Sequence, residues 1–246
     1  MNPPVTSRAV ISVLQSRREV AQGTMAFRFE KPQGWAFTAG QYLDMTLIDP
    51  PETDPEGNTR SFSIASAPEE DALMIATRVR DTAFKRVLKT MSIGGTVKIE
   101  GPSGDLTLPA DASRTVVLLA GGIGITPFRS MLVHAARAKL PHRLFLFYSN
   151  RRPEDTPFLQ ELRALENENQ RFTLVATMSE MTDSKRPWNG KTGQIDSALL
   201  SQYLKDTVSP IYYVAGPPGM VQALSGTLKK QSVPDADIHA EEFSGY

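Results

Sequence analysis

The stretch VVLLAGGIGITP, residues 116–127, is the most informative part of this 246-residue sequence. Its first five residues are apolar, as expected for a strand that is buried on both faces of a parallel sheet. The glycines that follow allow a backbone to approach an anionic group closely, because glycine has no Cβ atom. Thr126 suits the N-cap of a helix and Pro127 its first position, and a helix N-terminus favours a phosphate. The stretch predicts a nucleotide-binding turn, although a tight turn without a ligand could have the same pattern.

The rest of the C-terminal half alternates between expected strands and helices. A second glycine turn, AGPPGM at residues 215–220, follows one of these strands and leads into a helix. The ends of parallel strands line one crevice, so both glycine turns should face one ligand. We therefore predict an open parallel-sheet, Rossmann-like α/β domain. Its expected strands are residues 116–120, 143–148, 171–177, 211–215 and 238–243, and its helices lie near 128–135, 158–165 and 220–230.

The N-terminal half has a different pattern, because it consists of short apolar strands bounded by Gly, Pro or acidic residues. Such spacing predicts a six-stranded antiparallel β-barrel. A helix is expected over residues 82–90, with Asp81 as a candidate cap. The change of pattern near residues 108–113 predicts two domains, residues 1–110 and 111–246. The expected strands are residues 9–13, 26–29, 42–48, 61–64, 73–79 and 96–100.

Composition excludes several classes of function. Lys plus Arg and Asp plus Glu both number 27, so there is no basic excess of the kind that nucleic-acid binding needs. The chain has no cysteine, which excludes disulfides, thiolate zinc sites and iron–sulfur clusters held by its own thiolates. Its three histidines show no ligand spacing, so we assign no metal. No segment has the length of a membrane span and the first ten residues do not form a signal peptide, so we expect a cytoplasmic monomer.

Six motifs in the same order, taken together, resemble those of the ferredoxin–NADP reductase superfamily. The resemblance covers the whole chain and implies a flavin-binding barrel followed by a nicotinamide-nucleotide domain. It rests on an early strand motif at residues 37–42, the flavin motif RSFS at 60–63, GPSG at 101–104, the two glycine turns and the terminal EEF at 241–243.

The resemblance implies a set of flavin-binding residues in the first domain. Arg60 would contact the flavin pyrophosphate, because a guanidinium can hold two phosphate oxygens in a fixed geometry. Ser63 would hydrogen-bond flavin N5, the atom that accepts hydride. Phe62 replaces the tyrosine that is usual in the family, and it would stack on the flavin or pack as a plain core residue. The other implied flavin contacts are Ser61, Thr77, Arg78, Thr82, Ala83, Phe84 and Lys85.

The second domain would supply the nicotinamide site and the remainder of the reaction centre. Phe243 would cover the flavin face that the nicotinamide approaches, and Glu241 matches an acidic position of the family near the nicotinamide. Together with Ser63, these two residues form the predicted catalytic set. Ala215 stands where many relatives have cysteine, which bears on rate or geometry but not on reaction type, because the cofactors carry the reaction. The implied nucleotide contacts are Gly122, Gly124, Thr126, Pro127, Asn150, Arg151, Gly216, Pro217 and Met220.

The choice between NADH and NADPH depends on charges near the ends of two strands. Arg151 with Arg152, or Lys185 with Arg186, could attract a 2′-phosphate. Glu180, at the end of the third strand of the second domain, suits a free 2′-hydroxyl better, so we favour NADH slightly.

The implied function is an FAD-dependent NAD(P)H oxidoreductase that passes electrons to a separate acceptor. We expect a ferredoxin or flavodoxin as that acceptor, ahead of an oxygenase or another redox protein, and FAD ahead of FMN. Two alternatives remain: an NAD(P)H:flavin reductase that uses free flavin as a substrate, and an electron-transfer subunit that works only within a larger complex.

Overall fold

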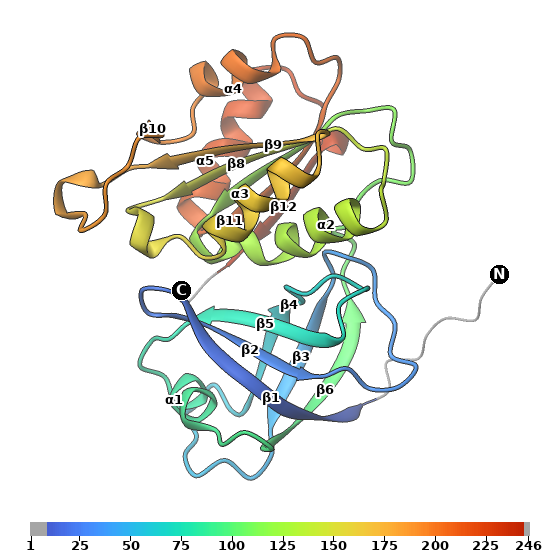
Figure 1. Ribbon diagram of the computed structural model, residues 1–246, viewed down its shortest axis with the longest axis vertical. Helices are drawn as coiled ribbons and strands as arrows, with labels where there is room; N and C mark the ends of the chain where they lie inside the picture. The colour runs from blue at the N-terminus through green and yellow to red at the C-terminus, as the bar shows by residue number, and fades with distance from the viewer. Residues whose placement is uncertain (1–8, 244–246) are drawn as a thin grey trace.

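The computed structural model describes residues 9–243, which form two six-stranded β-sheets joined by one connecting segment. Figure 1 shows the first sheet below and the second, covered by helices, above it. Residues 1–8 and 244–246 lie outside this range. They include most of the segment considered for a signal peptide, the start of the first predicted domain and the end of the second. An antiparallel six-stranded sheet followed by an open parallel one is confirmed as the fold class; closure of the first sheet into the predicted barrel stays a prediction, and we keep the name barrel for this sheet with its helix.

The first sheet is antiparallel throughout, in the order β4-β3-β6-β1-β2-β5. Strand β3 shows why its residues form a strand, since Leu43, Met45 and Leu47 alternate with less buried neighbours and point into the core. The two outermost strands form no ladder with each other; a hydrogen bond of 2.7 Å joins Ala65, just after β4, to the Met74 carbonyl of β5. The strands are β1 (Val10–Ala21), β2 (Thr24–Glu30), β3 (Tyr42–Leu47), β4 (Thr59–Ser63), β5 (Ala72–Arg78) and β6 (Thr96–Ser103).

Helix α1 (Ala83–Thr90) lies between β5 and β6 and confirms the predicted helix. Its apolar face, with Phe84 and Leu88, is buried in the barrel core. The N-cap is Thr82, whose hydroxyl accepts a bond from the Lys85 N–H, and not Asp81, the candidate named from the sequence. Asp81 is exposed and pairs with an arginine on the second turn of the helix instead.

The second sheet is parallel throughout, in the order β10-β9-β8-β7-β11-β12. Strand β7 (Val116–Gly121) is buried over its whole length, as its apolar sequence predicted. The chain winds in one direction from β7 to β9 and in the other from β11 to β12, so the topological switch point lies between β7 and β11. The other strands are β8 (Leu144–Asn150), β9 (Phe172–Met178), β10 (Lys191–Thr192), β11 (Ile211–Gly216) and β12 (Ile238–Glu242).

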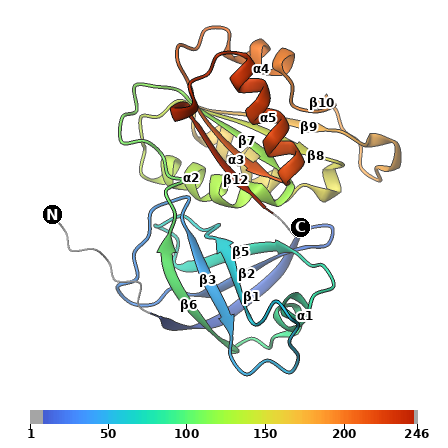
Figure 2. The same cartoon turned by 180° about the vertical axis from the view of Figure 1, so that it is seen from behind.

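Helices cover both faces of this sheet, because alternate residues of its strands belong to two different cores. Leu118 of β7 packs with Phe128 of α2 on the face toward the barrel. Val117 and Leu119 pack with Leu224 of α5 on the other face; Figure 2 shows α5 and α4 on that side. Helix α4 and strand β10 were not expected from the sequence. The helices are α2 (Ile125–Arg137), α3 (Leu159–Glu168), α4 (Ser197–Leu204) and α5 (Pro218–Lys230).

The start of α2 differs from the sequence prediction. Residues Gly122–Gly124 form a 3₁₀ turn that continues directly into the helix, so α2 begins at Ile125 and its N-cap is Gly124. Thr126 is therefore not the cap, and its hydroxyl donates to the Ile123 carbonyl at 3.0 Å. Pro127 occupies the third helical position, where a missing N–H is still tolerated because the first N–H groups of a helix lack intrahelical acceptors.

A buried ion pair joins the two domains. Arg129 of α2 donates to Glu70, in the β4–β5 connection, at 2.8 Å, and to the Ala65 carbonyl at 2.6 Å. Burial opposes the charge on Glu70, yet the hydrogen bonds from Arg129 hold the pKa of its carboxyl below the usual range. The chain passes from one sheet to the other between Ser103 and Val116. We propose that the domain boundary lies in this segment, where the change of sequence pattern falls.

Candidate functional site

Two cavities meet where the second domain faces the barrel. One, of about 290 Å³, is formed mainly by β3 and β4 of the barrel and by the last residues of β12. The other, of about 610 Å³, is formed by the two glycine turns together with Arg78 and Arg80 of the barrel. Phe243 lines both cavities, and its backbone N–H donates to the Gly216 carbonyl at 2.9 Å. The two glycine turns and the predicted flavin site are thus connected through one aromatic residue.

Ser63 forms part of the wall of the smaller cavity and is the feature that best indicates a ligand there. The residue is 5% exposed, and its Oγ atom has no hydrogen-bond partner among the described residues. A buried hydroxyl without a partner is costly, so its retention needs a reason. The site therefore fits a group that brings its own hydrogen-bonding atom to Ser63, as the flavin predicted from the sequence would.

Phe62 is a core residue that also borders the smaller cavity. Its side chain is 4% exposed, and its ring lies 5.8 Å from the ring of Phe84 in the barrel core. The residue also lines the smaller cavity beside Ser61 and Tyr42. Phe62 is thus a core residue with one accessible part, which leaves its proposed stacking against a flavin open to experiment.

Glu241, in the predicted catalytic set, also lines the smaller cavity. Burial, together with the negative charge of Asp105, raises the pKa of its carboxyl above the ordinary value. Its neighbour Glu242 accepts a hydrogen bond from Gln222 of α5 at 3.2 Å. Strand β12 thus brings two carboxylates and Phe243 to the rim of the cavity.

Close backbone packing shapes the larger cavity. A Cβ atom added at Gly124 would lie 2.3 Å from the Ala215 carbonyl oxygen, so the start of α2 lies directly against the end of β11. A Cβ at Gly121 would lie 2.4 Å from the sulfur of Met220. These contacts occur at the switch point, where an open α/β sheet binds its ligand. Packing therefore requires glycine at both positions.

Charged and polar groups converge on the same cavity. Arg78 and Arg80 come from the barrel, whereas Asn150 is the last residue of β8 and Arg151 follows it. The side-chain amide of Asn150 is buried beside the Tyr148 hydroxyl and lines the same cavity. Glu180 forms a 3.5 Å ion pair with Arg151.

Lys185 and Arg186 do not join this cavity. The Lys185 N–H donates to the Glu154 carboxylate at 2.9 Å, and the side chain of Arg186 contributes to a different groove. Of the four basic residues considered for a 2′-phosphate, Arg151 alone lines this cavity, because Arg152 pairs with Asp155 at 2.8 Å instead.

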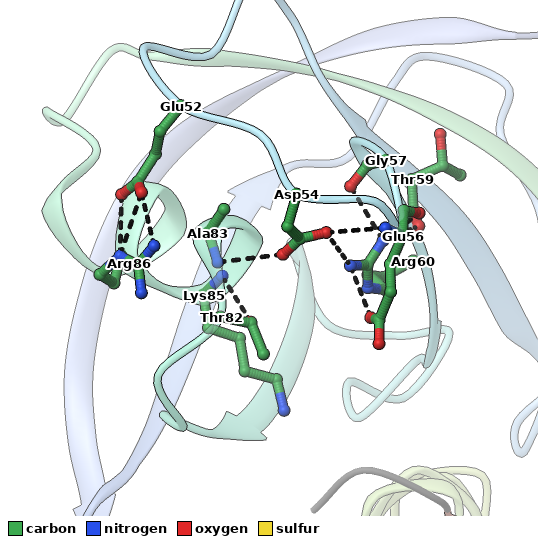
Figure 3. Close-up of polar contacts among 10 residues, drawn as sticks. All are labelled: Glu52, Asp54, Glu56, Gly57, Thr59, Arg60, Thr82, Ala83, Lys85 and Arg86. Atoms are coloured by element: carbon green, nitrogen blue, oxygen red, sulfur yellow. Dashed lines mark hydrogen bonds and ion pairs between the residues drawn. The ribbon is translucent and has the colours of Figure 1, made fainter.

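The predicted pyrophosphate site lies at the start of α1, where Thr82, Ala83 and Lys85 are close to Arg60 (Figure 3). Burial and the positive charges of Arg80 and Arg60 lower the pKa of Lys85 to about 8. Asp54 bridges two of these groups, since it accepts from Arg60 at 3.2 Å and from the Ala83 N–H at 3.1 Å. The cationic groups are assembled as the sequence predicted, but an acidic loop already contacts them.

Most predicted site residues come together around the two cavities. Those on the walls are Arg60, Ser61, Phe62, Ser63, Arg78, Gly122, Asn150, Arg151, Pro217, Met220, Glu241 and Phe243. Those outside the walls are Thr77, Thr82, Ala83, Phe84, Lys85, Gly124, Thr126, Pro127 and Gly216. The residues of the second group belong to the glycine turns, to the start of α2, to the end of β5 or to the start of α1. Their roles as cofactor contacts stay predictions.

Sequence reasoning missed several wall residues. Tyr42 belongs to the early strand motif, and its place beside RSFS follows from the pairing of β3 with β4, so the motif was the available signal. Arg80 also lines the larger cavity. The signal for it was its position two residues after Arg78, a residue already predicted for the site. Residues 194–196 line the larger cavity from the segment before α4, and no motif marked them.

The fold is that of solved FAD/NAD-binding reductases of the ferredoxin–NADP reductase type. Residues 118–226 match the oxidoreductase NAD-binding domain family. A ferredoxin NADP⁺ reductase from Neisseria gonorrhoeae, solved with bound FAD and NADP, superposes with a TM-score of 0.78 at 21% identity, over 96% of this chain and 99% of that one. An Amycolatopsis cytochrome P450 reductase gives a TM-score of 0.80 at 22% identity, over 97% of this chain and 71% of that one.

Curated relatives include reductase components of oxygenase systems. The chain is 28% identical to reductase component 2 of terephthalate 1,2-dioxygenase from Comamonas sp., over 85% of this chain and 60% of that protein. It is 26% identical to the glycine betaine monooxygenase reductase subunit of Chromohalobacter salexigens, over 95% of this chain and 62% of that protein. The chain thus spans about three-fifths of the length of these relatives.

These comparisons confirm the predicted resemblance to the ferredoxin–NADP reductase superfamily, and the family match covers most of the predicted nicotinamide-nucleotide domain. Within residues 9–243, no helix has the length and apolar character needed to span a bilayer. No group of acidic and histidine residues in the same range is arranged to hold a metal ion.

Proposed function

We propose that this protein is an FAD-dependent NAD(P)H oxidoreductase that delivers electrons to a separate redox protein. The observation that carries the proposal is the position of Phe243 on the walls of both cavities, with the unpartnered hydroxyl of Ser63 in a residue that also lines the smaller one. Bound FAD would supply the hydride-accepting centre that no side chain of the chain can provide.

The residues of the chain would bind, orient and shield the reactants. Ser63 is placed to offer a hydroxyl that can donate or accept in a site protected from water. Phe243 would separate the two cavities and would have to move for a nicotinamide to reach the smaller one. Glu241 has a raised pKa and lies at the same rim, where it could hold a proton near the reaction centre.

The nicotinamide nucleotide would lie in the larger cavity, at the switch point between β7 and β11. Its phosphates would face the N–H groups of the first glycine turn, and its remaining polar groups would meet Asn150 and Arg151. The ion pair of Glu180 with Arg151 supports a slight preference for NADH, because a carboxylate beside this arginine disfavours an additional phosphate.

For the electron acceptor we propose a ferredoxin, a flavodoxin or a redox component of an oxygenase system. The relatives support the last of these, since they are the reductase components of a terephthalate dioxygenase and a glycine betaine monooxygenase. The test is steady-state oxidation of NADH and of NADPH by the purified chain, with each class of acceptor supplied separately. Turnover with a protein acceptor supports the proposal, whereas turnover with free flavin or dyes alone contradicts it.

Retention of flavin separates the main proposal from its alternative. A prosthetic FAD should remain with the protein through dialysis, whereas a flavin that serves as substrate should be lost. Mass spectrometry of the released cofactor distinguishes FAD from FMN.

A further inference from the structure

An acidic segment of the β3–β4 connection lies over the start of α1. We call residues 52–56 the acidic strap, because they include Glu52, Asp54 and Glu56. Figure 3 shows Asp54 between the side chain of Arg60 and the backbone of Ala83. One carboxylate oxygen of Asp54 accepts from Arg60 Nη2 at 3.2 Å, and the other accepts from the Ala83 N–H at 3.1 Å.

The strap uses both terminal nitrogens of Arg60. Nη2 donates to the carboxylate of Glu56 at 2.8 Å as well as to Asp54. Nη1 donates to the backbone carbonyls of Glu56, Gly57 and Thr59, at 2.8–3.0 Å. A guanidinium that makes these five contacts has no terminal N–H left for a phosphate, and release of Asp54 and Glu56 would free Nη2.

The groups that the strap contacts are those that a flavin phosphate would need. Backbone N–H groups at a helix N-terminus and a guanidinium are common phosphate donors. Lys85 adds a positive charge on the first turn of α1, and it lies near enough to Arg60 and Arg80 for their charges to affect it. Asp54 and Glu56 are therefore anions in the place where the phosphates would bind.

We propose that Asp54 and Glu56 occupy the flavin-phosphate site of the flavin-free protein and must leave it before FAD can bind fully. The strap would compete with the phosphates for Arg60 and the start of α1. It would thereby set how tightly the protein retains a phosphate-bearing flavin. This inference rests on the proposed function, because it takes α1 and Arg60 as the flavin-phosphate site.

Flavin affinity measured on the full-length chain, after removal of any bound flavin, tests the proposal. The variant is Asp54→Asn combined with Glu56→Gln, which removes both charges but keeps a carbonyl oxygen that can still accept from the Ala83 N–H. Glu52→Gln is the matched control, because Glu52 lies in the same strap yet pairs with Arg86, away from Arg60. Each protein is titrated with FAD and with riboflavin, which has no phosphate.

We expect the double variant to bind FAD about tenfold more tightly, the order of effect when two partly exposed ion pairs no longer have to be broken. Riboflavin affinity should change by less than about twofold in every variant, and Glu52→Gln should leave FAD affinity similarly unchanged. Hydrogen exchange of residues 49–58 should become faster when FAD binds to the wild-type protein. If the double variant does not fold, Glu56→Gln alone should bind FAD about threefold more tightly.

The outcomes separate the strap from the proposed function. If the wild-type protein binds FAD but the double variant binds it equally or less tightly, the strap proposal is wrong and the proposed function stands. An equal gain for riboflavin would also overturn it, because the effect would then not involve the phosphates. If no protein binds either flavin, the proposed function fails and the strap proposal fails with it.

Discussion

The contact between the two glycine turns gives the sharpest prediction, for the substitution Gly124→Ala. The added Cβ atom would lie 2.3 Å from the carbonyl oxygen of Ala215 and 2.6 Å from the Gly216 nitrogen. Both are backbone atoms, so no side chain can rotate away, and α2 and β11 would have to separate by about 1 Å. Overpacking costs about 1–3 kcal/mol, and we expect the upper end here, with the KM for NADH raised at least tenfold by the displaced turn.

Gly226→Ala is the matched control for this change. Gly226 lies within α5, and a Cβ added there would meet no atom within 4 Å. Alanine in a helix is more stable than glycine by about 0.5–1 kcal/mol, so this variant should become more stable and keep its KM. Urea unfolding and NADH kinetics measure both effects. A Gly124→Ala variant with wild-type stability and KM would refute the close packing of the two turns.

Three further predictions follow from charges. Glu70→Gln should lower the free energy of unfolding by about 3 kcal/mol, because Arg129 stays buried without the negative charge of Glu70 beside it. Since folding lowers the pKa of Glu70, the difference in stability between wild type and variant, measured by urea unfolding, should shrink as the pH falls below 4.5. A difference that stays constant with pH would contradict this. FAD affinity should fall as the pH rises through about 8, where Lys85 loses its proton, and Lys85→Arg should abolish that dependence; a slope that persists in the variant would argue against Lys85 as a phosphate contact. Glu180→Gln should raise kcat/KM for NADPH relative to NADH about tenfold by removing the carboxylate beside Arg151, and an unchanged ratio would exclude Glu180 as a determinant.

The sequence predicted those elements whose signals are local. Val116–Gly121 is apolar throughout and forms the buried central strand, and the glycines after it mark the switch point. Helix α4 was missed because only Leu200 and Leu204 are buried on it, too few to show a helical period. Its capping residue, Asp196, which accepts from the Leu199 N–H at 2.8 Å, was the signal that could have revealed it.

The part of the site that could not be predicted depends on contacts between distant segments. Asp54 reaches the Ala83 N–H across 29 residues, and nothing in the sequence near Asp54 indicates this contact. Thr126 was named as a cap because it precedes a proline, but the glycines before it already form the first helical turn. Motifs identified which groups gather at the site, whereas packing determined which of them face the cavities.

Anaerobic reduction of the protein-bound flavin by NADH, followed through flavin absorbance after rapid mixing, tests the central claim most directly. If the cavities that meet at Phe243 hold the flavin and the nicotinamide, one equivalent of NADH should reduce the flavin of the wild-type protein. Ser63→Ala should bind flavin and unfold at the same urea concentration or higher, because it removes a buried hydroxyl without a partner, yet be reduced at least about tenfold more slowly. A wild-type flavin that NADH does not reduce, or an equal rate in the variant, would contradict the account.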